Sequence, residues 1–272
     1  MNKILIITIT FLGLCNTSNA QFDEKFYFPS KDYSINETVN HEDLFFEIDT
    51  VKIHTLWLKP KKETQTSILL FIGASGNASK YISIAKSFLS LGYQVLIFEP
   101  RGYGLSSGVP KHINVISDAQ IVFDSLLKRK EIENTKIVVY GASLGSQVAT
   151  HLTKNNQNKI SGLIIDGGMS SFTDIALSQA PETQKPMIQQ YLTSPYSVKE
   201  DIKEIKDLPK LVIHSIEDKT VPFSQAELNY KNAQQPKEFW VHKGGHLQAL
   251  REDNIAYIKT IGEFINNLNQ TK

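Results

Sequence analysis

The sequence predicts an α/β protein with a mostly parallel eight-stranded sheet, helices on both faces and a small cap insertion. Three observations carry this prediction. Short apolar, β-branched runs alternate strictly with amphipathic helical patterns from residue 67 onward. These runs are apolar throughout, as in strands buried on both faces of a parallel sheet. The stretch 167–205, with three prolines and only weak helical periodicity, interrupts the alternation and supplies the cap.

The composition is that of an ordinary globular protein, and 272 residues suffice for one large domain. Hydrophobic residues make up 41% and charged residues 21%, with a formal net charge of +1. A balance this even gives no indication of a nucleic-acid partner. The only cysteine is Cys15, so the chain beyond it has no disulfide, thiolate metal site or cysteine nucleophile.

Residues 1–20 are typical of a secretory signal peptide. Lys3 supplies the positive charge, and the apolar stretch 4–14 is too short to span a bilayer comfortably. We therefore expect an exported protein, periplasmic or secreted. An uncleaved anchor or a first buried strand is the alternative. A lipoprotein is less favoured, because Leu14 stands where lipidation at Cys15 needs a small residue.

The rest of the chain divides into an N-terminal arm, 21–43, and a main domain, 44–268. The arm mixes polar and aromatic residues, and we expect it to be loosely attached. Alternating apolar positions predict a hairpin of strands 44–48 and 51–58. Further strands are expected at 67–72, 93–98, 136–140, 162–166, 210–214 and 238–241, and helices at 80–91, 114–128, 144–154, 222–234 and 252–267.

The segment Gly141-Ala142-Ser143-Leu144-Gly145 lies between an expected buried strand and an amphipathic helix. In that setting Gly-x-Ser-x-Gly is typical of a nucleophile elbow, a sharp turn that exposes a strained serine above the strand end. Side chains at the two glycines would collide with the neighbouring strand and helix. We predict that Ser143 is a nucleophile. The alternative is an ordinary turn with a capping serine.

A serine nucleophile needs a base, and the loop after the last strand holds His242 and His246. Ligands bind at the carboxyl ends of parallel strands, where this loop begins. His246 follows a Gly-Gly pair that permits a sharp backbone excursion, so we predict that it is the base. His242 is the alternative. His214 ends its own strand and is expected to be packed or hydrogen-bonded.

The base in turn needs an orienting acid, and Asp218 is the predicted one. It lies in the loop after strand 210–214, just before Pro222 begins the next helix. Its neighbour Glu217 is expected to be a solvated rim charge. Asp166, at the end of the preceding strand, is the alternative acid.

Two backbone N–H groups are required to hold the oxyanion that forms during acyl transfer. One is expected from Leu144, directly after the nucleophile, where the following helix also directs its positive end. The other is expected from Ala74, in the loop after strand 67–72. Gly73 and Gly76 would let that backbone approach closely. A simple glycine turn is the alternative for this loop.

Taken together, these segments resemble the α/β-hydrolase superfamily. Within it, the chain is similar to compact abhydrolase-domain serine hydrolases related to acyl-protein thioesterases and monoacylglycerol-lipase-like enzymes. The resemblance covers 44–268 and rests on 73–77, 101–108, 141–145 and Asp218 followed by His246, in the order serine, acid, histidine. The chain departs from the family pattern at Ile72, where a histidine is usual, and at Glu99-Pro100, where aspartate is frequent. Arg101 is expected to hydrogen-bond neighbouring loops.

The expected activity is hydrolysis of carboxylic esters or thioesters through an acyl-enzyme, with Ser143, His246 and Asp218 as the triad. No metal or organic cofactor is required. The expected partner is a small-molecule or acyl ester substrate, which a membrane could present; the oligomeric state is open. Activity should fall in acid, because the base must be neutral. A peptidase or amidase on the same triad, or a non-catalytic binding protein of this fold, are the alternatives.

Overall fold

The computed structural model describes residues 22–35 and 39–268. The predicted export segment, 1–20, lies outside the described residues. Among those residues, no helix has the length and apolar character needed to cross a bilayer.

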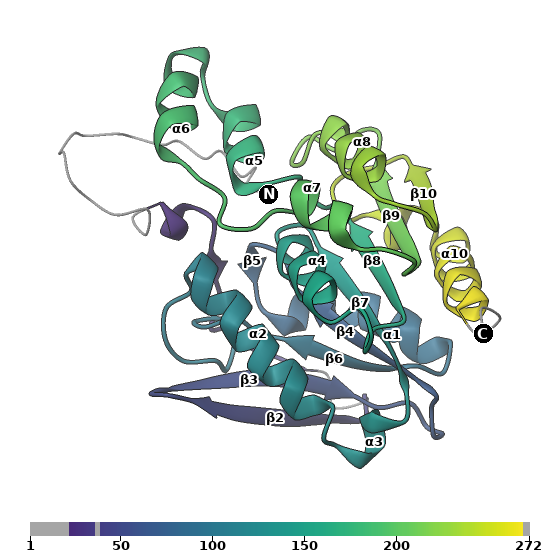
Figure 1. Cartoon of the computed structure of the whole chain (residues 1–272). Helices are drawn as coiled ribbons and strands as arrows, with labels where there is room; N and C mark the ends of the chain where they lie inside the picture. Colours follow the sequence, from purple (N-terminus) through teal and green to yellow (C-terminus); the bar gives the residue numbers. More distant parts are fainter. Residues whose placement is uncertain (1–21, 36–38, 269–272) are drawn as a thin grey trace.

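A central sheet runs through the protein (Figure 1). Its strands are β2 (His41–Ile48), β3 (Val51–Leu58), β4 (Thr66–Phe71), β6 (Gln94–Phe98), β7 (Lys136–Ala142), β8 (Gly162–Asp166), β9 (Lys210–Ser215) and β10 (Lys237–His242). Their order in space is β10-β9-β8-β7-β4-β6-β3-β2, and only β2–β3 and β3–β6 pair antiparallel. Every residue of β4, β6, β8 and β9 is buried. The predicted eight-stranded, mostly parallel sheet is therefore confirmed.

Helices cover both faces of this sheet. The helices outside the cap are α1 (Ile82–Ser90), α2 (His112–Leu126), α3 (Lys130–Glu133), α4 (Gly145–Asn155), α8 (Phe223–Asn232), α9 (Ala249–Glu252) and α10 (Asn254–Asn267). Figure 1 shows α2 and α4 in front of the sheet and α1 behind it. The last helix, α10, packs beside α1, since a Cβ at Gly262 would lie 3.4 Å from the Leu91 side chain.

The stretch 167–205 contains α5 (Phe172–Gln179), α6 (Lys185–Tyr191) and α7 (Val198–Asp201), with one short 3₁₀ turn between α5 and α6 and another after α7. Figure 1 shows α5 and α6 standing above the body of the protein, beyond the ends of the strands. The Gln179 side chain donates a hydrogen bond to the Thr220 carbonyl (2.8 Å). The insertion is thereby tied to the loop that carries Asp218.

The N-terminal arm is not loosely attached, so that prediction is wrong for residues 23–29. Phe26 and Tyr27 are buried, and strand β1 (Phe28–Pro29) pairs in parallel with β5 (Ser75–Gly76). The Tyr27 hydroxyl lies 2.9 Å from His112 Nδ1, at the start of α2. Local sequence could not show this attachment, because each partner lies far along the chain.

The segment after β6 anchors the loops near the sheet's carboxyl end. The Arg101 guanidinium forms two hydrogen bonds to the Asp118 carboxylate of α2, at 2.7 and 2.8 Å. The expectation that Arg101 would bond neighbouring loops is therefore corrected: its partner is a helix. Glu99 is fully buried, accepts the Ala78 N–H (2.7 Å) and pairs with His54 Nδ1 (2.7 Å). This glutamate holds the chain directly after the predicted oxyanion loop.

Candidate active site

Ser143 occupies the turn between β7 and α4 with a backbone φ of +52°, a conformation that residues other than glycine rarely adopt. The flanking glycines are required by sterics. A Cβ at Gly141 would lie 2.5 Å from Ser146 Cα in α4, and one at Gly145 would lie 2.2 Å from the Phe71 carbonyl oxygen of β4. The turn can therefore form only with glycine at both positions, which holds the serine above the strand end.

The neighbouring strand β8 supports this turn and brings a histidine to it. The Ser143 N–H donates to the Asp166 carbonyl (2.8 Å) at the end of β8. A Cβ on the next residue, Gly167, would lie 3.0 Å from His246 Cε1. The imidazole thus lies against the same strand end that holds the serine. Among the described residues, no hydrogen bond joins the Ser143 hydroxyl to His246.

His246 is paired with Asp218, as expected for a base and its orienting acid. Nδ1 of the imidazole donates to Asp218 Oδ2 at 2.6 Å. The other carboxylate oxygen accepts the N–H groups of Thr220 (2.8 Å) and Val221 (2.9 Å). With Nδ1 committed to Asp218, Nε2 is the nitrogen left to accept a proton. Gly244, with φ +103°, provides the backbone excursion that the Gly-Gly pair predicted.

The electrostatics keep Asp218 ionised. Burial raises the pKa of this carboxyl group, but the hydrogen bond and charge of His246 and the two backbone N–H groups outweigh that effect. The resulting pKa lies below the ordinary value. An ionised Asp218 can only accept a hydrogen bond, so it holds the imidazole in the tautomer that carries its proton on Nδ1.

The alternative base, His242, takes another partner: its Nδ1 lies 2.7 Å from the Lys243 carbonyl. His214 is buried and hydrogen-bonded, as expected, with its Nε2 2.9 Å from the Val221 carbonyl and 3.5 Å from Asp218 Oδ2. The Asp166 carboxylate accepts the Tyr140 hydroxyl rather than a histidine, and burial raises its pKa.

Glu217 is exposed, as expected of a rim charge, but it is not free of partners. Its carboxylate accepts the Gly244 N–H at 3.0 Å. It therefore ties the acid loop to the histidine loop, a contact that the sequence did not suggest.

The two residues expected to supply the oxyanion donors, Ala74 and Leu144, lie on the same pocket as the serine. Among the hydrogen bonds of the described residues, neither of their N–H groups has an acceptor. Two unpaired donors beside a strained serine hydroxyl are what an oxyanion requires.

Three residues that the sequence analysis missed hold the loop of Ala74 in place. The Tyr81 hydroxyl accepts the Gly73 N–H (2.7 Å), and the Tyr103 hydroxyl donates to the Ala74 carbonyl (2.6 Å). The Phe28 N–H donates to the same carbonyl (2.8 Å). Of the three, only Tyr103 could have been suspected from the sequence, since it belongs to the 101–108 segment on which the family resemblance partly rests.

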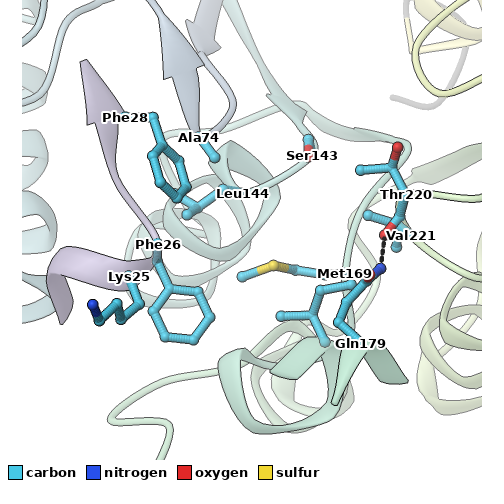
Figure 2. Close-up of a pocket in the computed structure, with 11 residues that line it drawn as sticks. Lys25, Phe26, Phe28, Ala74, Ser143, Leu144, Met169, Gln179, Thr220 and Val221 are labelled. Carbon is cyan, nitrogen blue, oxygen red and sulfur yellow. Dashed lines mark hydrogen bonds between the residues drawn. The ribbon is translucent and has the colours of Figure 1, made fainter. Parts of the chain in front are cut away.

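Figure 2 shows the pocket beside Ser143. Its walls come from five parts of the chain: the N-terminal segment, the Ala74 loop, the turn at Ser143 and Leu144, the insertion 167–205 and the loop after β9. Eleven residues line it: Lys25, Phe26, Phe28, Ala74, Ser143, Leu144, Met169, Ile175, Gln179, Thr220 and Val221. None of them is acidic. Within the described part of the chain, no three His, Cys, Asp or Glu side chains gather as a metal site would require.

The serine lies on a strained strand-to-helix turn, and the paired aspartate and histidine follow it along the chain at the ends of later strands. This arrangement is typical of the α/β-hydrolase fold. Solved structures agree with it: an esterase from Pyrococcus furiosus superposes with a TM-score of 0.70 at 20% identity, covering 89% of this chain and 97% of its own.

Sequence comparisons place the chain within the same group. The family profile described as "Serine aminopeptidase, S33" matches residues 62–192. The "Alpha/beta hydrolase domain-containing protein WAV2" of Arabidopsis thaliana is 29% identical over 256 residues, covering 87% of this chain and 83% of its own. "Protein bem46" of Schizosaccharomyces pombe is 35% identical over 167 residues, 61% of this chain and 56% of its own. The chain belongs to the α/β-hydrolase superfamily.

Proposed function

We propose that this protein is a serine hydrolase that cleaves carboxylic esters or thioesters. The observation that carries the proposal is the Asp218–His246 pair against the strand end that holds the strained Ser143. The unpaired N–H groups of Ala74 and Leu144 on the same pocket support it. So does the likeness in fold to solved esterases.

In the proposed reaction, the Ser143 hydroxyl attacks the ester carbonyl while His246 Nε2 takes its proton. The Ala74 and Leu144 N–H groups hold the negative oxygen of the tetrahedral intermediate. The C–O or C–S bond then breaks, and the imidazolium gives its proton to the leaving group. Water, activated by the same histidine, hydrolyses the acyl-enzyme and frees the acid.

The matching family description favours a second candidate, an aminopeptidase on the same three residues. An aminopeptidase must hold the charged α-ammonium of its substrate, usually with a carboxylate. No acidic residue lines the pocket. The charged residue in its lining is Lys25, whose positive charge would repel an ammonium group. Esters therefore fit this pocket better than peptide N-termini.

One assay series decides between the two candidates. The purified protein is given p-nitrophenyl acetate, a phenyl thioacetate and a set of aminoacyl p-nitroanilides, and is labelled in parallel with a fluorophosphonate probe. We expect labelling at Ser143 and turnover of the ester and thioester. Turnover of the anilides alone would favour the peptidase. If the protein were not labelled and turned over no substrate, both candidate functions would be contradicted.

We expect log(kcat/KM) for p-nitrophenyl acetate to fall on acidification with a limiting slope of one proton. Protonated His246 cannot take the serine proton, so activity is lost as pH falls. Asp218 remains ionised meanwhile, because its pKa is held below the ordinary value of 3.8. A slope of two would show that the carboxyl group titrates with the imidazole.

Acid unfolding is separated from this loss by circular dichroism at each pH. A depressed carboxyl pKa contributes stability above pH 3.8, and that contribution disappears as pH falls through the folded-state value. The loss of stability due to Asp218 is therefore expected near and below pH 3.8, and the circular dichroism signal shows at each pH whether the fold persists.

Tyr103→Phe is expected to lower kcat about tenfold with little change in KM. The substitution removes the O–H that holds the Ala74 carbonyl, so the neighbouring oxyanion donor is less well placed. The matched control is Tyr93→Phe, whose hydroxyl contacts Asn266 at 3.5 Å, outside the pocket lining. Equal kcat in the two variants would show that Tyr103 does not position the loop.

A further inference from the structure

The cavity beside Ser143 is small, about 30 Å³. A water molecule needs roughly 10–15 Å³ on the same measure, so the cavity has room for about two or three groups of that size. Most of its lining is apolar: Phe26, Phe28, Ala74, Leu144, Met169, Ile175 and Val221. A short hydrocarbon chain fits this space and chemistry.

The position of the cavity relative to the histidine tells which part of the substrate enters it. His246 must protonate the leaving group, so the leaving group lies on the side of the imidazole. His246 is not among the residues that line the cavity, whereas Ser143 and both oxyanion donors are. The acyl group is the substituent left to occupy it.

We propose that the enzyme is selective for short acyl groups, of about two to four carbons, and that Phe26, Phe28 and Met169 determine this limit. The inference rests on the proposed ester hydrolysis. It assigns a role in specificity to the N-terminal segment, which precedes the hydrolase domain.

Two of the side chains that line the cavity, Met169 and Phe26, are held in place and cannot move aside easily. Figure 2 shows the Met169 side chain pointing toward the Phe26 ring. The two residues are 3% and 6% exposed. The Phe26 ring meets the Phe172 ring edge-to-face at a centroid distance of 5.2 Å, and the Met169 carbonyl accepts the Gln147 amide at 2.6 Å.

The segment that carries Phe26 is itself anchored on both sides. Before it, the Asp23 carboxylate accepts the His112 N–H at 2.8 Å. After it, the Phe28 N–H donates to the Ala74 carbonyl, and Phe28 lines the same pocket as Leu144 (Figure 2). A longer acyl chain would have to displace this wall, and overpacking a filled site is costly.

The test compares kcat/KM for p-nitrophenyl acetate, butyrate and octanoate. We expect kcat/KM for acetate to exceed that for octanoate by at least about 100-fold in the wild type, since even one methylene that does not fit costs roughly 10- to 200-fold. Phe26→Ala and Met169→Ala should each raise kcat/KM for octanoate and thereby reduce the acetate-to-octanoate ratio of kcat/KM about tenfold. Phe28→Ala should do the same without a risk to folding, because that ring is 40% exposed and its backbone bonds remain.

The matched control is Phe45→Ala, a similarly exposed phenylalanine (41%) on β2 that does not line the pocket. Its acyl preference should equal that of the wild type. Fluorophosphonate titration counts active sites in every variant. If the probe labelled Ser143 and octanoate were hydrolysed as fast as acetate, the short-acyl inference would be overturned, but the proposed hydrolase function would stand. An unchanged ratio in all three pocket variants would overturn the role of the N-terminal wall. Absence of both labelling and turnover would instead refute the proposed function.

Discussion

Ser143→Ala is expected to lower kcat for p-nitrophenyl acetate by about 10⁴- to 10⁶-fold, because without the hydroxyl no acyl-enzyme forms. Residual hydrolysis above the rate in water would come from the two oxyanion donors and from substrate binding alone. The substitution removes one oxygen and adds no volume, so the fold should persist. The measurement is steady-state kinetics together with loss of fluorophosphonate labelling.

Ser90→Ala is the control for this variant, since Ser90 is an exposed serine at the end of α1, outside the pocket lining. It should hydrolyse the ester as the wild type does. If the Ser143 variant kept more than about a hundredth of the wild-type kcat, another nucleophile would have to be sought.

Asp218→Asn should lower kcat by about 10⁴-fold while leaving KM within a few-fold. An amide keeps the size of the carboxyl group but can offer its N–H to His246 Nδ1. That would favour the tautomer with the proton on Nε2, where it cannot accept the serine proton. The loss should be largest near neutral pH, where the wild-type aspartate is fully ionised, its pKa being depressed.

Asp166→Asn is the matched control, and it also tests the alternative acid. In the wild type, one oxygen of the Asp166 carboxylate accepts the Tyr140 hydroxyl. The other oxygen is fully buried and has no hydrogen-bond partner among the described residues. Activity should stay within about tenfold of wild type, because the side chain does not bond His246. If Asp166→Asn inactivated the enzyme and Asp218→Asn did not, the assignment of the acid would be reversed.

The pH dependence of stability provides a further readout for Asp166. Burial raises the pKa of its carboxyl group, so ionisation destabilises the folded state at neutral pH. The melting temperature of Asp166→Asn should therefore exceed that of the wild type at pH 8. The difference should shrink as the pH is lowered and the wild-type carboxyl group takes up a proton.

Local pattern was enough to predict the sheet and the turn at Ser143. Fully apolar strands leave no choice of face, and steric requirements at Gly141 and Gly145 are visible as glycines in the sequence. The order of strands and the spacing of loops then narrowed the histidine and the acid to two residues each. The structure pairs one member of each set, His246 with Asp218, and gives His242 and Asp166 other partners.

What sequence reasoning missed involves contacts between residues far apart along the chain. The Phe28 N–H reaches the Tyr103 hydroxyl across 75 positions, and the Asp23 carboxylate reaches His112 across 89. Neither partner carries a local signal for the other. An arm that mixes aromatic and polar residues has the same periodicity whether it is loose or packed, so its burial could not be inferred.

The sequence by itself determined the fold class, the strained serine and the set of candidate partners, because steric and periodic constraints act between near neighbours in the chain. Only the tertiary structure decided which histidine bonds which carboxylate, how Tyr81 and Tyr103 hold the Ala74 loop, and that Phe26 and Phe28 line the pocket. Those choices depend on ångström-scale distances between side chains from different elements, which exist only once the sheet has assembled.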